Sequence, residues 1–214
     1  MPDYLATIAE AVKSGDDKLV ENIADEALGA GVAAKEILNG GLIPGIQALG
    51  QMFKDGQAYL PEILISARAM RRGVDKVKPH LSSKDIAGKG VVVIGTVEGD
   101  MHDIGKNLVR MMLESNGYAV HDLGVDVSPA SFAETSRDVG ANIVAASALL
   151  TTTMTMIPDI VAALDKVGLK DKVSVMIGGA PINREFADQV GAKGYADDCA
   201  SAVDEADRLM KLAA

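Results

Sequence analysis

The sequence of 214 residues has very few of the side chains that cross-link a chain or stack on nucleic-acid bases. It contains one cysteine, Cys199, which excludes an internal disulfide. It contains no tryptophan, and aromatic residues make up 3% of the chain, too few for a base-stacking platform. A disulfide framework and a single-strand nucleic-acid platform are therefore both disfavoured.

An excess of positive charge and a long apolar run are lacking as well. The formal net charge is −9, whereas binding to phosphate backbones requires clustered Lys and Arg. No uninterrupted apolar run is long enough to cross a membrane, and the acidic, amphipathic start of the sequence is unlike a secretory signal. We therefore expect a cytoplasmic protein with no nucleic-acid partner and no membrane partner.

The sequence has two halves that differ in their pattern of apolar residues. In residues 1–80 the apolar positions recur at helical spacing, and glycine-containing breaks fall at 14–16, 29–31, 39–41 and 56–61. This pattern predicts a bundle of four or five helices. Residues 81–88 are predicted to be a linker between this helical domain and a second domain, residues 89–214.

The second half alternates between strand and helix patterns. Strands are predicted at 90–95, 119–123, 142–147, 173–177 and 193–195, and helices at 103–116, 129–139, 152–167, 183–190 and 198–212. Five βα units predict a doubly wound, parallel, five-stranded sheet of the flavodoxin or Rossmann-like type. This half also holds most of the acidity, with 18 acidic and 11 basic groups after residue 85 against 12 and 10 in residues 1–85.

The loop that follows the first predicted strand contains Asp100, His102 and Gly105, spaced as D-x-H-x-x-G. Ligands of open α/β sheets bind at the carboxyl ends of the strands, where this loop lies. A histidine there suits a metal ligand, and a carboxylate two residues earlier can hold the far ring nitrogen and fix the tautomer. A single loop histidine is by itself a weak signal, because most such residues bind nothing.

The other strand ends carry small and hydroxyl residues. They are residues 147–153 after the third strand, 178–180 after the fourth and 195–199 after the fifth. Each segment alone is explained by ordinary turn and capping chemistry. Together they line one edge of one sheet beside His102, where small residues admit a large ligand and hydroxyls satisfy its polar groups. We therefore expect a deep ligand site at this edge.

The loop after the first predicted strand and the segments after the third and fourth strands together resemble the cobalamin-binding signature of corrinoid proteins and of the cobalamin module of methionine synthase. In that signature D-x-H-x-x-G is followed by S-x-L with further hydroxyls and then by a Gly-Gly pair. The resemblance implies that His102 is the lower axial ligand of cobalt, in place of the cofactor's benzimidazole, and that Asp100 and Thr153 form a relay behind it. It implies a cofactor-binding set of Met101, Asp103, Ile104, Gly105, Ser147, Leu149, Thr151, Gly178, Gly179, Tyr195 and Cys199.

The helical half is similar to the cap that precedes the cobalamin domain in the same families, most clearly in GLIPGIQALGQMFKDGQAYLPEILISARAM. By this likeness the upper face of the corrin would be covered by Asn39, Phe53, Leu60 and Ile63. An apolar cover would exclude water and oxygen from the cobalt. The basic residues Arg68, Arg71, Arg72, Lys76 and Lys78 are interpreted as a solvated face or a docking face.

Four alternative functions fit the sequence less well. A nucleotide-binding enzyme would need G-x-G-x-x-G after the first strand, or a Ser or Thr after Gly105-Lys106, where Asn107 stands. A phosphorylation receiver would need an aspartate where Ser147 ends the third strand. A cobalamin-dependent isomerase needs a large barrel, so this chain would be a small subunit, and a cobalamin-sensing regulator adds a basic DNA-binding module.

The resemblance implies a methyl carrier of anaerobic one-carbon metabolism. Its cofactor would be cobalamin or a related corrinoid, alternating between cob(I)alamin and methylcob(III)alamin. A substrate-specific methyltransferase would supply the methyl group from a methylamine, betaine, methanol or methoxyaromatic donor. A second methyltransferase would pass it to tetrahydrofolate or a thiol, and a reductive activase would restore the cofactor. The chain itself would then be a methyl-carrying subunit that is not catalytic alone.

Overall fold

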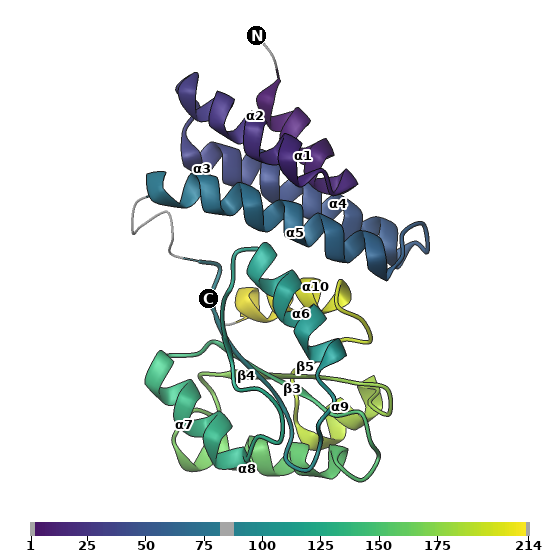
Figure 1. The fold of residues 1–214 in the computed structure, drawn as a ribbon. Helices are drawn as coiled ribbons and strands as arrows, with labels where there is room; N and C mark the ends of the chain where they lie inside the picture. Colours follow the sequence, from purple (N-terminus) through teal and green to yellow (C-terminus); the bar gives the residue numbers. More distant parts are fainter. Residues whose placement is uncertain (1–2, 82–87, 213–214) are drawn as a thin grey trace. The chain divides into compact units, whose positions relative to one another are not determined.

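The chain divides into two compact units, a helical unit within residues 1–87 and an α/β unit within residues 88–214. The computed structural model describes residues 3–81 and 88–212 (Figure 1). Apart from its first and last residues, the predicted linker 81–88 lies outside the described residues.

The helical unit is a small bundle in which apolar stripes face a common core. Asp3 and Asp16 cap the first two helices by accepting backbone N–H groups, and Gly15 ends the first helix with a φ of 77°. The elements are α1 (Tyr4–Ser14), α2 (Asp17–Gly29), α3 (Ala34–Ile37), the π-helical turn η1 (Leu38–Leu42), α4 (Ile43–Lys54), α5 (Leu60–Val77) and the 3₁₀ turn η2 (Lys78–His80).

One predicted break in this bundle is wrong. Residues 39–41 do not interrupt a helix, because α3 continues through η1 into α4. The glycines of this segment serve packing instead. A Cβ atom on Gly41 would lie 3.0 Å from Cγ2 of Ile8, and one on Gly45 would lie 2.5 Å from the carbonyl oxygen of Ala9. Glycine at these positions therefore lets α4 and η1 approach α1 closely.

The basic face predicted on α5 is largely paired with acids of α2. Three ion pairs join the two helices at intervals of four residues on each, which places them along one side of both helices. They are Arg68–Asp17 at 3.0 Å, Arg72–Glu21 at 3.7 Å and Lys76–Asp25 at 2.7 Å. Arg68, Arg72 and Lys76 thus have acidic partners on α2.

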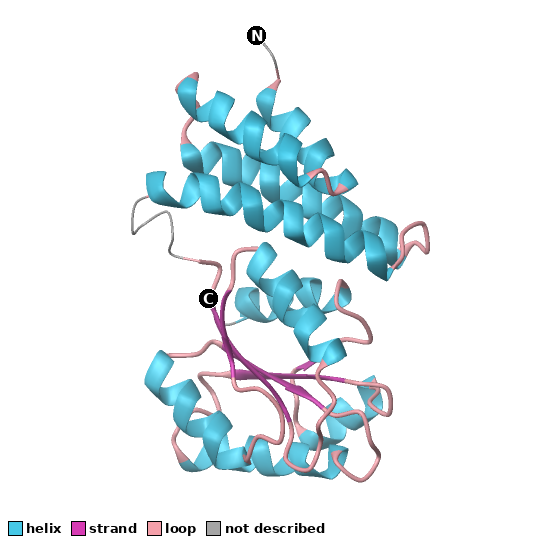
Figure 2. Ribbon diagram, in the orientation of Figure 1, coloured by secondary structure: helices cyan, strands magenta, loops and turns pink. Residues whose placement is uncertain are grey.

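The α/β unit contains one parallel sheet, whose strands are magenta in Figure 2. Its strand order is β2-β1-β3-β4-β5, which confirms the predicted fold class. Each predicted strand agrees with an observed strand to within one residue at either end, because runs of β-branched residues mark the buried strands. The strands are β1 (Val91–Thr96), β2 (Ala119–Asp122), β3 (Ile143–Ser147), β4 (Ser174–Gly178) and β5 (Gly194–Tyr195).

Helices cover both faces of the sheet (Figure 1). On one face lie α6 (Ile104–Ser115) and α10 (Ser201–Leu212), and on the other lie α7 (Pro129–Val139), α8 (Ile157–Lys166) and α9 (Arg184–Val190). The core under α7 and α8 includes Phe132, Val93 and Val144, all fully buried. Gly95 makes room there, since a Cβ atom on it would lie 2.8 Å from Cζ of Phe132.

Two helices begin later than predicted. The predicted helix 152–167 starts as turns and a 3₁₀ segment, η3 (Met154–Met156), and becomes α-helical at Ile157 next to a proline in the first turn. The predicted helix 198–212 begins at Ser201, because Asp198 turns back to accept the N–H groups of Ala200 and Ser201. Within the described residues, no helix combines the length and apolarity needed to cross a membrane.

The strand order places a switch point between β1 and β3. The chain leaves β1 toward β2 on one side and leaves β3 toward β4 on the other, so the loops after β1 and β3 diverge from adjacent strand ends. Thr96 and Ser147 are register partners at these ends. In doubly wound sheets, ligands bind at the carboxyl ends of the strands at such a switch point.

Candidate functional site

The loop after β1 is held by several backbone contacts. The N–H of Asp100 donates to the carbonyl oxygen of Val97 at 3.1 Å, which closes a turn at Gly99, where φ is 81°. The hydroxyl of the fully buried Thr96 donates to the carbonyl oxygen of His102 at 2.9 Å. The loop is therefore tied to the strand it leaves on both sides of Asp100.

Asp100 is fully buried, and its carboxylate joins the loop after β1 to the loop after β3. Its Oδ1 accepts a hydrogen bond from His102 Nδ1 at 2.7 Å and one from the His102 N–H at 3.1 Å. Its Oδ2 accepts from the Leu149 N–H at 2.7 Å and from the Thr153 hydroxyl at 2.8 Å. One carboxylate thus makes four hydrogen bonds across the switch point.

These contacts keep Asp100 ionised. Burial by itself raises the pKa of a carboxyl group, because it disfavours the charged form. Hydrogen bonds from the N–H of Leu149, from the N–H and ring of His102 and from the hydroxyl of Thr153 outweigh burial and hold the pKa of Asp100 well below its usual range. A permanent negative charge therefore lies behind the histidine ring.

His102 presents the opposite edge of its ring to the surroundings. Its side chain is 52% exposed, although its partner Asp100 has no exposure. With the carboxylate at Nδ1, the neutral form of the ring has its proton on Nδ1 and offers the lone pair of Nε2 to a metal. Among the described residues there is no cluster of three or more His, Cys, Asp or Glu side chains able to hold a metal ion. The donor set therefore fits a metal that brings most of its ligands with it.

Exposed apolar side chains lie near this histidine in the sequence and on the loop after β3. Met101 is 68% exposed, Ile104 is 74% exposed, and Leu149 and Leu150 on the facing loop are 40% and 42% exposed. A Cβ atom on Gly105 would meet no atom within 4 Å. A one-histidine site with apolar neighbours and open space at its edge suits a large, flat, mostly apolar ligand that already encloses a metal.

Comparison with known proteins identifies the family to which such a site belongs. Residues 90–204 match the model of a B12 binding domain, and residues 4–78 match a second model with the same description. A corrinoid protein of Desulfitobacterium hafniense is 36% identical over 96% of this chain and 97% of its own. The chain belongs to the B12-binding corrinoid proteins.

Two further relatives support the assignment. Trimethylamine corrinoid protein 1 of Methanosarcina acetivorans is 38% identical over 94% of each chain. In the crystal structure of the methanol:cobalamin methyltransferase complex of Methanosarcina barkeri, one chain matches with a TM-score of 0.87 and 30% identity, over 98% of this chain and 80% of that chain. The cofactor of this corrinoid protein is therefore cobalamin or a related corrinoid, as the sequence predicted.

The structure of this corrinoid protein brings some of the predicted site residues together. Asp100, His102, Leu149 and Thr153 form one hydrogen-bonded group, and Thr153 is buried within it. Met101, Asp103, Ile104, Gly105, Ser147 and Thr151 lie on the same two loops or at their ends. That these residues bind the corrinoid stays a prediction.

The predicted glycine pair has a reason within the chain itself. A Cβ atom on Gly179, where φ is 134°, would overlap the carbonyl oxygen of Ala148, and one on Gly178 would lie 2.8 Å from that of Ala196. The N–H of Ala148 also donates to the carbonyl oxygen of Gly178 at 3.1 Å. Close approach between the chain's own loops is therefore enough to require both glycines, whether or not a ligand also contacts them.

Tyr195 and Cys199 belong to the far end of the sheet, at β5 and the turn before α10. The guanidinium of Arg184 lies over the ring of Tyr195, 5.6 Å from its centroid. Burial, with the nearby charge of Asp198, raises the pKa of the Cys199 thiol to about 11. This cysteine is therefore protonated at neutral pH and is a small buried residue rather than a nucleophile.

The predicted cap residues differ in exposure within the helical unit. Ile63 is fully buried in the core of the bundle, so it presents no surface to a ligand there, and Phe53 is partly buried. Leu60 is 37% exposed and Asn39 is exposed. Tyr59 and Leu64, in the same segment, are 68% and 46% exposed. Leu60 and Leu64 lie four residues apart on one face of α5.

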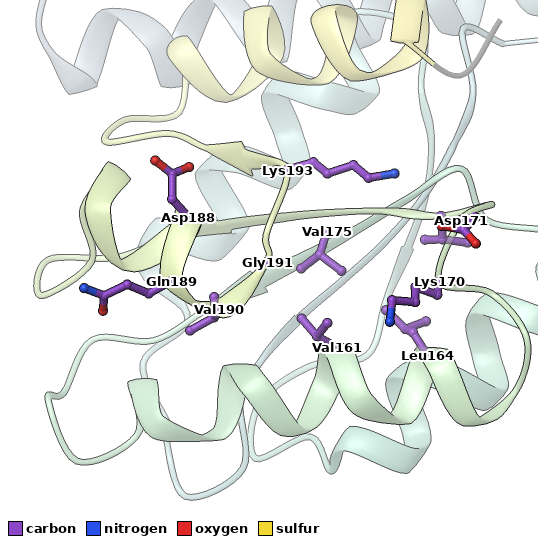
Figure 3. A pocket seen from close by; sticks show the side chains of 11 residues that line it. Val161, Leu164, Lys170, Asp171, Val175, Asp188, Gln189, Val190, Gly191 and Lys193 are labelled. Carbon is purple, nitrogen blue, oxygen red and sulfur yellow. The ribbon is translucent and has the colours of Figure 1, made fainter.

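A cavity of about 420 Å³ lies elsewhere, between α8 and α9 (Figure 3). Val161, Leu164, Val175 and Val190 form its apolar wall, and charged side chains surround its mouth. Two of its lining residues, Val173 and Lys193, immediately precede β4 and β5. The cavity is therefore at the amino ends of these strands, the edge opposite His102, and is no part of the candidate site.

Proposed function

We propose that this corrinoid protein carries a methyl group on cobalt between two methyltransferases. The observation that carries the proposal is the pair Asp100–His102, in which a buried, ionised carboxylate leaves one nitrogen of an exposed imidazole for a metal. Relatives named trimethylamine and dimethylamine corrinoid proteins, and a structural neighbour in a methanol:cobalamin methyltransferase complex, support methyl transfer as the process served.

Each part of the site would then have a defined task. Nε2 of His102 would bind the cobalt of a corrinoid, while Asp100 holds the ring in place and Thr153 and the loop after β3 hold Asp100. The exposed apolar side chains of Met101, Ile104 and Leu149 would pack against the ring of the cofactor. The corrinoid supplies the cobalt on which a methyl group is held, and the protein supplies ligation and shielding.

The partners follow from the chemistry of the carrier. A methyltransferase specific for the donor must load the methyl group, and the names of the relatives favour methylated amines or methanol as donors over betaines and methoxyaromatics. A second methyltransferase must remove it to tetrahydrofolate or a thiol. A reductive activase is needed because a low-valent cobalt centre is readily oxidised.

Replacing the ligand histidine tests the proposal. We expect His102→Ala to change the visible spectrum of the bound corrinoid, to abolish the nitrogen splitting of the Co(II) electron paramagnetic resonance signal and to weaken binding. His121→Ala is the matched control, because His121 is an exposed histidine of β2. A His102→Ala protein with the wild-type spectrum and signal would exclude this histidine as the ligand.

A second experiment separates a carrier from an enzyme. The reduced holo-protein is incubated with trimethylamine or methanol, with and without the donor-specific methyltransferase. We expect rapid methylation of the cofactor in the presence of the methyltransferase and none in its absence. Rapid methylation by the carrier alone would mean that the chain activates the donor itself.

A further inference from the structure

We propose that Asp126, in the loop between β2 and α7, is a positioning residue that fixes the loop carrying His102. No residue of the predicted site lies in this loop, and Asp126 makes its hydrogen bonds to Gly99 and Asp100 rather than to the ring of His102. It acts on the backbone just before the histidine. The inference rests on the proposed role of His102 as the cobalt ligand.

Asp126 grips the histidine loop at two consecutive residues. Its Oδ1 accepts a hydrogen bond from the N–H of Gly99 at 2.7 Å, and its own N–H donates to the carbonyl oxygen of Asp100 at 3.0 Å. Asp126 thus bonds to the N–H of Gly99 and to the carbonyl group of Asp100, which are the two ends of this dipeptide. Since Asp100 in turn binds the ring of His102, its backbone position sets where the imidazole lies.

The backbone of Asp126 has an uncommon conformation, in which it makes both hydrogen bonds to the histidine loop. Its φ is 54°, and among the described residues it is the one non-glycine residue in the left-handed region. Asp and Asn tolerate this region better than other side chains, because their short polar groups bond locally. Here the carboxylate bonds not to its own turn but to Gly99, a residue 27 positions away in the sequence. A strained backbone directed at a functional loop indicates a constraint on that loop.

The loop that contains Asp126 is itself held by backbone hydrogen bonds to β1. The N–H of Thr96 donates to the carbonyl oxygen of Gly124, and the N–H of Val127 donates to that of Thr96, each at 3.0 Å. The loop after β2 is therefore an extension of the sheet beside β1. Asp100 is held from this side through its backbone and from the β3 side through its carboxylate. Supports on both sides preorganise a metal ligand better than either alone.

Two substitutions separate the carboxylate from the backbone. Asp126→Gly keeps the positive φ and the N–H that donates to Asp100, but it removes the acceptor for Gly99. Asp126→Asn keeps an amide oxygen as acceptor and tolerates the same φ. Asp171→Gly is the matched control, because Asp171 is an exposed aspartate in a turn at the opposite edge of the sheet.

The first measurement uses the apoprotein and needs no corrinoid. Amide hydrogen exchange at Gly99 should be about threefold to tenfold faster in Asp126→Gly than in wild type, the loss expected for one hydrogen bond. Asp126→Asn should restore most of the protection, and Asp171→Gly should leave it unchanged. Wild-type exchange at Gly99 in Asp126→Gly would overturn the proposed clamp.

The second measurement uses the holo-protein and follows the histidine ligand. In Asp126→Gly the ratio of histidine-bound to histidine-free Co(II), read from nitrogen splitting in the electron paramagnetic resonance spectrum, should fall about threefold to tenfold. Asp126→Asn should recover it, which a loss of general stability would not. An unchanged ratio in Asp126→Gly, or no recovery in Asp126→Asn, would overturn the positioning role. A wild-type protein with no histidine-bound cobalt would instead overturn the proposed function.

Discussion

Two buried carboxylates of the α/β unit, Asp100 and Glu205, are both held ionised but by partners of different charge. Glu205 on α10 accepts hydrogen bonds from Arg208 at 2.7 and 2.8 Å, from Arg184 at 3.0 Å and from the N–H of Tyr195 at 3.1 Å. The bonds from Arg208 and Arg184, with that from the Tyr195 N–H, outweigh burial and lower the pKa of Glu205 to about 2. Asp100 reaches a low pKa with neutral donors and a histidine.

The difference shows which carboxylate serves the fold and which serves the site. The charge of Glu205 is neutralised by two guanidinium groups, and the cluster ties α9, β5 and α10 together. The charge of Asp100 has no Lys or Arg partner in the described part of the chain, so it acts on the imidazole and on whatever the imidazole binds. Loss of Glu205 should therefore reduce stability, and loss of Asp100 should reduce ligation.

The largest effect is expected for Glu205→Ala. Removing this carboxylate breaks the hydrogen bonds from two guanidinium groups and one backbone N–H, of which Arg208 and Arg184 retain only bonds to the carbonyl oxygens of Lys193 and Tyr195. The loss of these charge-assisted bonds should lower the free energy of unfolding by about 3 kcal/mol. Urea denaturation followed by circular dichroism measures the loss. The spectrum of bound corrinoid should stay that of the wild type, and a changed spectrum in a folded variant would break the proposed division of roles.

The contribution of Glu205 to stability should also appear in the pH dependence of the free energy of unfolding. The folded-state pKa of Glu205 is about 2 and its ordinary value is 4.5, so its contribution to stability is complete above about 4.5 and is lost as the pH falls toward 2. Between these values Glu205→Gln should lose less stability than wild type on acidification. Urea midpoints at several pH values test this, and parallel curves for the two proteins would contradict it.

The next effect is expected for Asp100→Asn. An amide cannot supply the charge that directs Nδ1–H toward it, so corrinoid affinity should fall about 10-fold to 100-fold. Absorbance titration of the apoprotein measures this affinity, with Glu205→Gln as the control carboxylate variant. If both variants lost affinity equally, the distinction between the two carboxylates would fail.

The smallest effect is expected at Thr153. Thr153→Val removes a hydroxyl that donates to Asp100, a loss of one hydrogen bond worth about 1 kcal/mol, or roughly fivefold in the fraction of histidine-bound cobalt. Thr153→Ser keeps the donor and should behave as wild type. The spectrum of the Co(II) form compares them. Equal behaviour of the serine and valine variants would show that the hydroxyl has no part in ligation.

Much of the fold could be predicted from the sequence because local pattern and tertiary structure agree. Runs such as 92–94 are buried between helices on both faces, so their composition alone marks central strands. The pairing of Asp100 with His102 could be predicted from spacing, because the two residues lie two positions apart on one loop. The hydroxyl of Thr153 was placed by resemblance, since nothing local links it to Asp100, 53 residues away.

Other features depend on contacts that are distant in the sequence. Gly40 and Gly41 were interpreted as a break by their local propensity, but their role is set by Leu5 and Ile8 on α1, which approach where a Cβ atom would lie. Asp126 gave no local signal, because its conformation and its partner Gly99 are defined only when β1 and β2 pair. Propensity describes one segment, whereas close approach is a property of two.

The overlap of any side chain at Gly179 with the carbonyl oxygen of Ala148 bears on how the holo-protein is made. The ends of β3 and β4 are locked together by the chain's own backbone, and the N–H of Ile182 closes the following turn on the carbonyl oxygen of Gly179 at 2.9 Å. We therefore expect this edge to form from the chain's own contacts, so that apoprotein produced without the cofactor can be reconstituted with it.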